Sequence, residues 1–347
     1  MASCASEMKN TRGMSEQVAS FMRIEQVTRR FEMRPGAFES LLHRLGVGAG
    51  PQFVTAVDNV SLNIARGSIF GLVGESGCGK STLGRIAARL LPATSGRVIF
   101  DDIPLDDGSL TPAALLRLQM VFQNPMASLN PRQRVMDIIT EGAIYHGVIA
   151  RRQRTDFAVS LLAEVGLSAD AAFRLPHQFS GGQRQRIGIA RALSVSPDFL
   201  ICDEPVAALD VSIQAQIINL LLDLSRNRNL TMLFISHDLG VVRHLCDRVA
   251  VMYLGQIVEQ APAADLFANP RHPYTKALLE QAPSIKAGRR AYRPIEGEIP
   301  SPFAPPKGCR FHPRCPVAVE RCGRDAPPQT GDEKHLARCW LLNDGSR

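Results

Sequence analysis

The sequence predicts an α/β protein with a parallel sheet, an inserted helical subdomain and a C-terminal extension. Apolar runs at 68–73, 199–203 and 232–236 read as buried strands, and the amphipathic segment 212–227 lies between the last two. This strand–helix–strand alternation is typical of a parallel sheet. A glycine-rich loop follows the first run, and four cysteines lie close together near the C-terminus. The loop predicts a phosphate site, and the cysteines predict a separate function for the extension.

Composition limits the class of protein. The chain has 347 residues, of which 45% are hydrophobic, enough for one large domain and an appendage. The first residues lack the apolar stretch of a signal peptide, and no segment approaches the roughly 18 consecutive apolar residues of a spanning helix. We therefore expect a soluble, unexported protein with a disordered tail at 1–20. The net charge is +7, without a stripe of alternating basic and aromatic residues. This pattern argues against a nucleic-acid groove, and a weak attraction to anionic membranes is at least as compatible with it.

The remaining elements follow from local patterns. Alternating apolar residues predict a strand over 21–33, and residues 36–53 read as an inserted loop. Region 124–190 is predicted to be a helical subdomain, whose last helix begins near Gln183. The core domain is expected to span 21–260. Prolines cluster between 294 and 306, so the extension at 261–347 is predicted to have little regular structure.

The segment "GESGCGKST" at 74–82 matches the P-loop pattern G-x-x-x-x-G-K-[ST]. It follows a predicted buried strand and precedes a predicted helix, which is where a phosphate-binding loop has to lie. Gly77 and Gly79 allow backbone N–H groups to converge on phosphate, Lys80 reaches the β- and γ-phosphates, and Ser81 is a ligand for Mg²⁺. The alternative is an ordinary glycine turn. The predicted nucleotide-binding residues of this loop are Gly74, Ser76, Gly77, Cys78, Gly79, Lys80, Ser81 and Thr82.

Polar residues follow two further predicted strands. Asp203 and Glu204 end "FLICDEP", and His237 follows "MLFIS". Beside a P-loop, Asp203 is expected to bind the magnesium or its water, and Glu204 to activate the attacking water. His237 is expected to contact the γ-phosphate. Loop solvation is the alternative for the carboxylates, and a lone surface histidine for His237.

A second candidate phosphate loop lies at 179–183, "FSGGQ". Ser180, Gly181 and Gly182 precede the helix predicted to begin near Gln183, so they offer another helix N-terminus with exposed N–H groups. A nucleotide held by its own P-loop does not need this second loop. We therefore predict that it closes over a nucleotide held by a second copy of the fold.

The order of these motifs resembles the ATP-binding subunits of ABC transporters. It comprises the P-loop, "FQNP", "FSGGQ", "CDEP", "AALD" and "SHD". The resemblance covers about residues 21–345. It implies an ABC-type P-loop NTPase, with a RecA-like mixed sheet, a helical signature subdomain and an antiparallel β edge. It also implies a head-to-tail dimer, in which each ATP lies between one P-loop and the signature loop of the other subunit.

The resemblance also assigns roles to single residues. Gln123 would be a magnesium ligand and catalytic residue, and would link the magnesium site to the membrane partner. Asp210 would belong to the loop that crosses the dimer. His237 would be the family's switch histidine, which contacts the γ-phosphate. Phe31 best matches the aromatic residue that stacks on adenine, and Phe53 is the alternative. Ala208 stands where many members have serine.

"QNPMASLNPR" and "RHPYTKALLE" resemble the oligopeptide, dipeptide and nickel importers, and look closest to the second of their two ATPase subunits. The implied partners are a related ATPase, two permeases and, indirectly, an external solute-binding protein, with this chain at the cytoplasmic face of a bacterial plasma membrane. Peptide is the expected cargo, with nickel, glutathione and other small solutes as alternatives. More distant alternatives are an efflux subunit and a soluble ABC ATPase acting on nucleic acid.

The extension carries Cys309, Cys315, Cys322 and Cys339. Four thiolates suit a tetrahedral metal or a [4Fe–4S] cluster. Some members of the family that the chain resembles carry a [4Fe–4S] cluster in this tail. We therefore expect a cluster here, with zinc and free thiols as the alternatives. His312 and His335 are close in sequence but are expected to be bystanders. ATP and Mg²⁺ are the other expected ligands.

Overall fold

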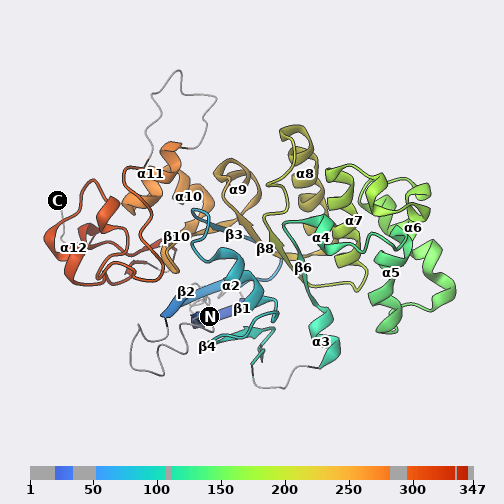
Figure 1. The fold of residues 1–347 in the computed structure, drawn as a ribbon, viewed down its shortest axis with the longest axis horizontal. Coiled ribbons are helices and arrows are strands. Elements are labelled where there is room, and N and C mark those ends of the chain that lie inside the picture. The colour runs from blue at the N-terminus through green and yellow to red at the C-terminus, as the bar shows by residue number, and fades with distance from the viewer. Residues whose placement is uncertain (1–19, 34–51, 107–110, 282–294, 333, 343–347) are drawn as a thin grey trace, which may run out of the picture.

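The computed structural model describes residues 20–33, 52–106, 111–281, 295–332 and 334–342. They form two sheets, a helical region and a C-terminal extension (Figure 1). The predicted tail lies outside the described residues except for Ser20, and so does the predicted inserted loop except for Gln52 and Phe53, which begin a strand.

The larger sheet has eight strands in the order β11-β12-β10-β9-β3-β8-β7-β6. Its parallel part is built from short strands that are almost completely buried, as expected where a sheet is covered on both faces. The predicted parallel strands are thus confirmed. The five parallel strands are β6 (Leu118–Val121), β7 (Phe199–Asp203), β8 (Thr231–Ser236), β3 (Ile69–Val73) and β9 (Arg248–Tyr253).

A smaller antiparallel sheet packs against this core, in the order β2-β1-β4-β5. Its strands are β1 (Ser20–Met33), β2 (Gln52–Ala65), β4 (Ser95–Phe100) and β5 (Ile103–Pro104). A hydrophobic cluster joins the two sheets to helix α2 (Lys80–Ala87), which follows β3. It includes Phe21, Phe100 and Phe199, whose rings contact one another. The P-loop therefore lies where both sheets and α2 meet.

The helical region lies on the right in Figure 1. It contains α4 (Pro125–Ser128), α5 (Val135–Tyr145), α6 (Arg154–Glu164) and α7 (Gly181–Leu193). Helix α7 begins two residues before the predicted start, because the Ser180 side chain accepts from the Gln183 N–H and the Gln183 side chain accepts from the Ser180 N–H. This reciprocal cap satisfies N–H groups that the helix cannot satisfy.

The other helices connect the strands. They are α3 (Pro112–Leu116) before β6, α8 (Val211–Arg228) between β7 and β8, and α9 (Leu239–Leu245) between β8 and β9. Helix α8 confirms the amphipathic segment predicted at 212–227, and it ends at Asn229 in the left-handed conformation, a common helix stop. Among the described residues, no helix combines the length and apolarity needed to cross a membrane.

The expectation of little regular structure after residue 260 is wrong. Strand β10 (Gln256–Pro262) crosses that position, and β12 (Leu336–Ala337) pairs with β10 and with β11 (Thr330–Gly331). The extension also forms α10 (Ala263–Ala268), α11 (Pro273–Gln281) and α12 (Glu320–Arg324). A high proline content argues against regular structure only locally. Here pairing with the sheet stabilises short elements despite that local composition.

A buried carboxylate organises the junction between sheet and extension. Glu259 on β10 is 1% exposed. Its oxygens accept from the backbone N–H groups of Arg271 and His272, at 2.7 and 2.9 Å, and lie 2.7 Å from Nε2 of His335. One side chain thus joins the sheet edge, the start of α11 and the last part of the extension.

Replacing Glu259 should therefore destabilise the fold. Glu259→Ala leaves two buried N–H groups and an imidazole without their acceptor, and we expect the free energy of unfolding to fall by about 3–5 kcal/mol. Glu280→Ala, at an exposed position on α11, should change it by less than about 0.5 kcal/mol. Denaturant unfolding of both variants measures the difference, and equal losses would contradict the role given to the buried carboxylate.

Candidate functional site

The P-loop at 74–82 joins β3 to α2 and passes very close to other backbone segments. Gly74 has φ 155°, and a Cβ there would lie 2.1 Å from the carbonyl oxygen of Met252. Gly79 has φ 108°, and its Cβ would lie 2.1 Å from the carbonyl oxygen of Ala56. Gly77, with φ 79°, has open space around it. Any side chain at Gly74 or Gly79 would force the loop away from β9 or β2.

Lys80 lies inside the curve of this loop. Its ammonium donates to the carbonyl oxygens of Gly74 and Glu75, at 2.7 and 3.0 Å, and the residue is only 4% exposed. Burial raises the pKa of the neighbouring Cys78 thiol, although the Lys80 charge acts in the opposite direction. The loop therefore concentrates one positive charge and the start of α2 at one point, which is what an anionic phosphate requires.

Two of the three predicted magnesium ligands, Ser81 and Asp203, meet, whereas Gln123 contacts Glu204. Ser81, at the start of α2, donates from Oγ to Oδ1 of Asp203 at 2.7 Å. Asp203 ends β7 and is 2% exposed, and burial raises the pKa of its carboxyl despite the hydrogen bond from Ser81. A hydroxyl and a carboxylate are the oxygen ligands that Mg²⁺ takes beside a phosphate. These residues fit that ion.

Three predicted catalytic residues form one group. Nε2 of Gln123 donates to Oε2 of Glu204 at 2.8 Å, and Nδ1 of His237 lies 3.5 Å from Oε1. Glu204 directly follows β7 with φ 46°, a left-handed conformation, and its N–H donates to the carbonyl oxygen of Ile235. Because β6, β7 and β8 are parallel, their carboxyl ends bring these side chains to one edge of the sheet.

The second glycine loop starts helix α7. Ser180 and Gly181 are exposed, whereas Gly182 is buried. A Cβ on Gly182 would lie 2.3 Å from Cγ2 of Ile213, so the first turn of α7 packs directly on α8. Figure 1 shows α2 in the centre of the molecule and α7 to the right of it. The two predicted phosphate loops are therefore separate within one chain.

The two remaining predicted nucleotide contacts lie elsewhere. Asp210 is exposed and precedes α8. Phe31 pairs with Val54 across β1 and β2, and the Arg29 guanidinium lies 4.7 Å from its ring centroid. Phe53 pairs with Glu32 in the adjacent register, which places it on the opposite face, and it is 51% exposed. Only one of the two phenylalanines can therefore face a given nucleotide, and Phe31 remains a prediction.

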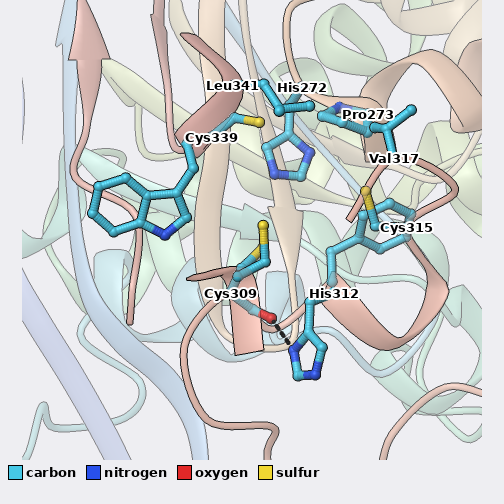
Figure 2. A pocket seen from close by; sticks show the side chains of 11 residues that line it. His272, Pro273, Cys309, His312, Cys315, Val317, Cys339 and Leu341 are labelled. Carbon is cyan, nitrogen blue, oxygen red and sulfur yellow. Dashed lines mark hydrogen bonds between the residues drawn. The ribbon is translucent and has the colours of Figure 1, made fainter. Parts of the chain in front are cut away.

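The four C-terminal cysteines line one small cavity of about 10 Å³, the space of roughly one water molecule. Figure 2 shows Cys309, Cys315 and Cys339 around the imidazole of His272. Burial raises the pKa of Cys309 to about 11, with further contributions from the neighbouring thiols. Across the described residues, no three His, Cys, Asp or Glu side chains are grouped closely enough to hold a metal ion.

The two histidines that lie near these cysteines in the sequence have other contacts. Nδ1 of His312 lies 2.8 Å from the carbonyl oxygen of Cys309, and His312 lines the cavity (Figure 2). His335 contacts Glu259 instead. His272, which the sequence did not single out, also lines the cavity. Burial lowers its pKa to about 3, so its Nδ1 is free to accept the Tyr274 N–H.

Comparison with known proteins gives the family. Residues 57–207 match the ABC transporter family, and residues 258–322 match the C-terminal region of oligopeptide/dipeptide transporters. The chain is 47% identical over 331 residues to the oligopeptide transport ATP-binding protein AppF of Bacillus subtilis, covering 93% of this chain and 98% of that protein. The chain belongs to the ATP-binding proteins of ABC transporters. This ABC protein is accordingly an ATPase.

Other relatives agree. The dipeptide transport ATP-binding protein DppF of Haemophilus influenzae is 47% identical over 86% of this chain and 92% of its own length. A probable peptide ABC transporter ATP-binding protein of Sinorhizobium fredii is 48% identical over 89% of this chain and 86% of that protein. A solved dimeric ATP-binding cassette in a post-hydrolysis state with ADP and Pi matches with a TM-score of 0.59, 28% identity, and coverage of 70% of this chain and 98% of that one.

Sequence reasoning missed the contacts that join the P-loop to the extension. The Glu75 carboxylate pairs with Arg314, and the Glu75 N–H donates to the hydroxyl of Tyr274. The only signal for these residues was the stretch "RHPYTKALLE", which contains Tyr274 but pointed to a family and not to a contact. Arg314 lies between two of the cysteines and carried no signal of its own.

The packing of α7 on α8 predicts that alanine at two glycine positions of α7 has very different effects on the rate of ATP hydrolysis. Gly182→Ala places a methyl group against Ile213 and shifts the loop at 179–183, which corresponds to the signature loop of the family that the chain resembles, so we expect ATP hydrolysis to fall about 10- to 100-fold. Gly188→Ala has nothing within 4 Å of its new methyl group and should stay within about 2-fold. Steady-state hydrolysis at saturating ATP compares them, and equal rates would argue against a positioned signature loop.

Proposed function

We propose that this chain is the ATP-hydrolysing subunit of an importer that takes up peptides. The observation that carries the proposal is the convergence of Ser81 with Asp203, and of Gln123 and His237 with Glu204, next to a P-loop. Peptide as the cargo is supported by the match of residues 258–322 and by relatives named for oligopeptide, dipeptide and peptide transport.

ATP would bind through its phosphates. Backbone N–H groups of the P-loop and the ammonium of Lys80 would hold the β- and γ-phosphates, in place of the carbonyl oxygens that Lys80 now contacts. Ser81 and Asp203 would hold Mg²⁺, which neutralises charge that develops on the phosphates. A bound cation would also favour the charged form of Asp203 against the effect of burial.

Glu204 would act on the attacking water. Its carboxylate is partly buried, with 12% of the side chain exposed, and it contacts an amide on one oxygen and an imidazole on the other. Gln123 would hold the carboxylate and link the site to the membrane partner, while His237 would contact the γ-phosphate. In this arrangement Glu204 takes a proton from water as the water attacks the γ-phosphorus and the β–γ bridging oxygen leaves with ADP.

The separation of α2 from α7 supports a site shared by two subunits. Ser180, Gly181 and Gln183 are exposed at the start of α7, where they can meet ATP held by another P-loop. Asp210 is exposed as well and would lie at the contact between subunits. We propose a related ATPase as the second subunit, two permeases in the membrane and an external binding protein, with this chain at the cytoplasmic face of a bacterial membrane.

We also propose that the extension holds a [4Fe–4S] cluster through Cys309, Cys315, Cys322 and Cys339. Support comes from the shared cavity and from the donor set, since four thiols suit a cluster with one cysteine on each iron. As they lie here, the described thiols are not grouped closely enough to hold a metal ion, so they would have to move to hold a cluster. When bound, such a cluster supplies a rigid cross-link between four chain positions.

Glu204→Gln should separate binding from hydrolysis. The amide keeps the size of the side chain but cannot take a proton, so we expect hydrolysis to fall about 10²- to 10⁴-fold with ATP binding unchanged. The variant should also accumulate as an ATP-bound dimer, measured by size-exclusion chromatography. Lys80→Ala is the control that should lose ATP binding, and normal turnover by Glu204→Gln would remove Glu204 as the base.

The same variant tests the cargo. Cells that make the complete transporter should accumulate a labelled di- or oligopeptide with the wild-type chain and not with Glu204→Gln. Nickel uptake under the same conditions should not differ. If nickel uptake depends on Glu204 and peptide uptake does not, the cargo is a metal and not a peptide. If the chain co-purifies with RNA and not with permeases, the transport function is wrong.

Anaerobic purification with metal analysis tests the cluster. We expect broad visible absorbance and about four irons per chain, both lost in Cys315→Ser. Cys246→Ser, which changes a buried cysteine outside the cavity, should keep both. Iron-free protein, with or without zinc, would contradict the cluster and leave the ATPase unaffected.

A further inference from the structure

The residue after the first P-loop glycine is held from outside the loop. Glu75 accepts two hydrogen bonds from Arg314, Nη1 to Oε2 at 2.7 Å and Nη2 to Oε1 at 3.1 Å. The backbone N–H of Glu75 donates to the hydroxyl of Tyr274 at 3.0 Å. Both partners belong to the C-terminal extension. The extension therefore fixes the side chain and the main chain of one P-loop residue.

The position of Arg314 is tightly constrained. It ends a short 3₁₀ helix at 312–314, between Cys309 and Cys315, and only 5% of its side chain is exposed. Its guanidinium also lies 5.9 Å from the ring centroid of Tyr253 and donates to its hydroxyl at 3.4 Å. Burial alone would lower the pKa of Arg314, but the hydrogen bonds to Glu75 and Tyr253 raise it above its usual range. This cation is held in one geometry.

Aromatic packing fixes Tyr274 in the same way. Its ring is fully buried and contacts the rings of Tyr253 and Phe311, with centroids 4.7 and 5.3 Å away. The imidazole of His272 accepts its backbone N–H. Tyr274 therefore presents its hydroxyl to the P-loop from a rigid support.

These contacts reach the phosphate-binding groups through one residue. The carbonyl oxygen of Glu75 accepts from the ammonium of Lys80, and the carbonyl oxygen before it, from Gly74, accepts from the same ammonium. A shift of Glu75 would move both carbonyl groups and the N–H groups of the loop that follows. The position of Glu75 therefore determines where the Lys80 ammonium and the N–H groups of the loop lie when phosphate binds.

We propose that Arg314 and Tyr274 are positioning residues of the ATP site, which hold the P-loop in its phosphate-binding conformation through Glu75. We name these three residues the P-loop brace. The proposal rests on the ATP site described above and is independent of the cargo. In this arrangement the extension contributes directly to the affinity of the cassette for ATP.

The test compares KM for ATP with kcat. Arg314→Gln leaves the Glu75 carboxylate without its partner and loosens the loop before ATP arrives, so we expect KM to rise about tenfold with kcat within about 2-fold. Arg314→Lys keeps the charge without the two-pronged geometry and should restore part of the affinity. Tyr274→Phe removes a single hydroxyl and should raise KM about 3-fold with the fold intact.

A second ion pair between extension and core supplies the matched control. Arg310 pairs with Asp58 on β2, and the side chains are 12% and 25% exposed, close to the 5% and 20% of Arg314 and Glu75. Arg310→Gln should therefore weaken the docking of the extension to a similar degree, measured as a fall in Tm. The hydrogen bonds of Arg310 go to Asp58 and to the carbonyl oxygen of Leu254, neither of which belongs to the P-loop, so Arg310→Gln should leave KM for ATP within about 2-fold.

A double-mutant cycle isolates the route through Glu75. In a Glu75→Gln background, Arg314→Gln should add little to KM, because the carboxylate it positions is already gone. An unchanged KM in both Arg314→Gln and Tyr274→Phe would overturn the brace, and so would equal increases in Arg314→Gln and Arg310→Gln, which would reflect docking alone. Retention of ATP binding by Lys80→Ala would instead contradict the ATP site itself.

Discussion

Two glycines of the P-loop lie where only backbone can fit. At Gly74 and Gly79 a Cβ would lie 2.1 Å from a carbonyl oxygen, on β9 at one position and on β2 at the other. The loop is therefore confined between the parallel sheet and the antiparallel sheet. The position of Ser81 depends on that confinement, because α2 starts at the end of the loop and carries Ser81 to Asp203.

The parallel strands supply the rest of the site in a simple way. β7 and β8 run side by side, so Glu204 and His237 emerge at the same edge, and β6 brings Gln123 from the other side of β7. The left-handed backbone of Glu204 turns the chain sharply after β7. Strain of this kind is common where a side chain must be aimed at a reacting group.

The parts predictable from sequence are those fixed by local patterns. Continuous apolar runs gave β3, β7 and β8 within a residue, since strands buried on both faces need no polar positions. The sequence-based start of α7 was two residues too late, because the reciprocal cap between Ser180 and Gln183 extends the helix to Gly181. The start of α11 and strand β12 were missed because they depend on contacts with Glu259 and on aromatic packing around Tyr274, which no local pattern encodes. The pairing of Glu75 with Arg314, which lie 239 positions apart, has no sequence signal.

Strand β10 has a consequence for how the chain folds as it is synthesised. Its outer side pairs with Leu336 and Ala337, which are made long after β10 itself. Until the ribosome has released those residues, the sheet ends in an open strand, and open strands are sites of aggregation. The nascent protein must therefore carry an unfinished sheet edge from the synthesis of β10 until that of β12. Strand β12 covers that edge once it has been made, and β11 then pairs with β12.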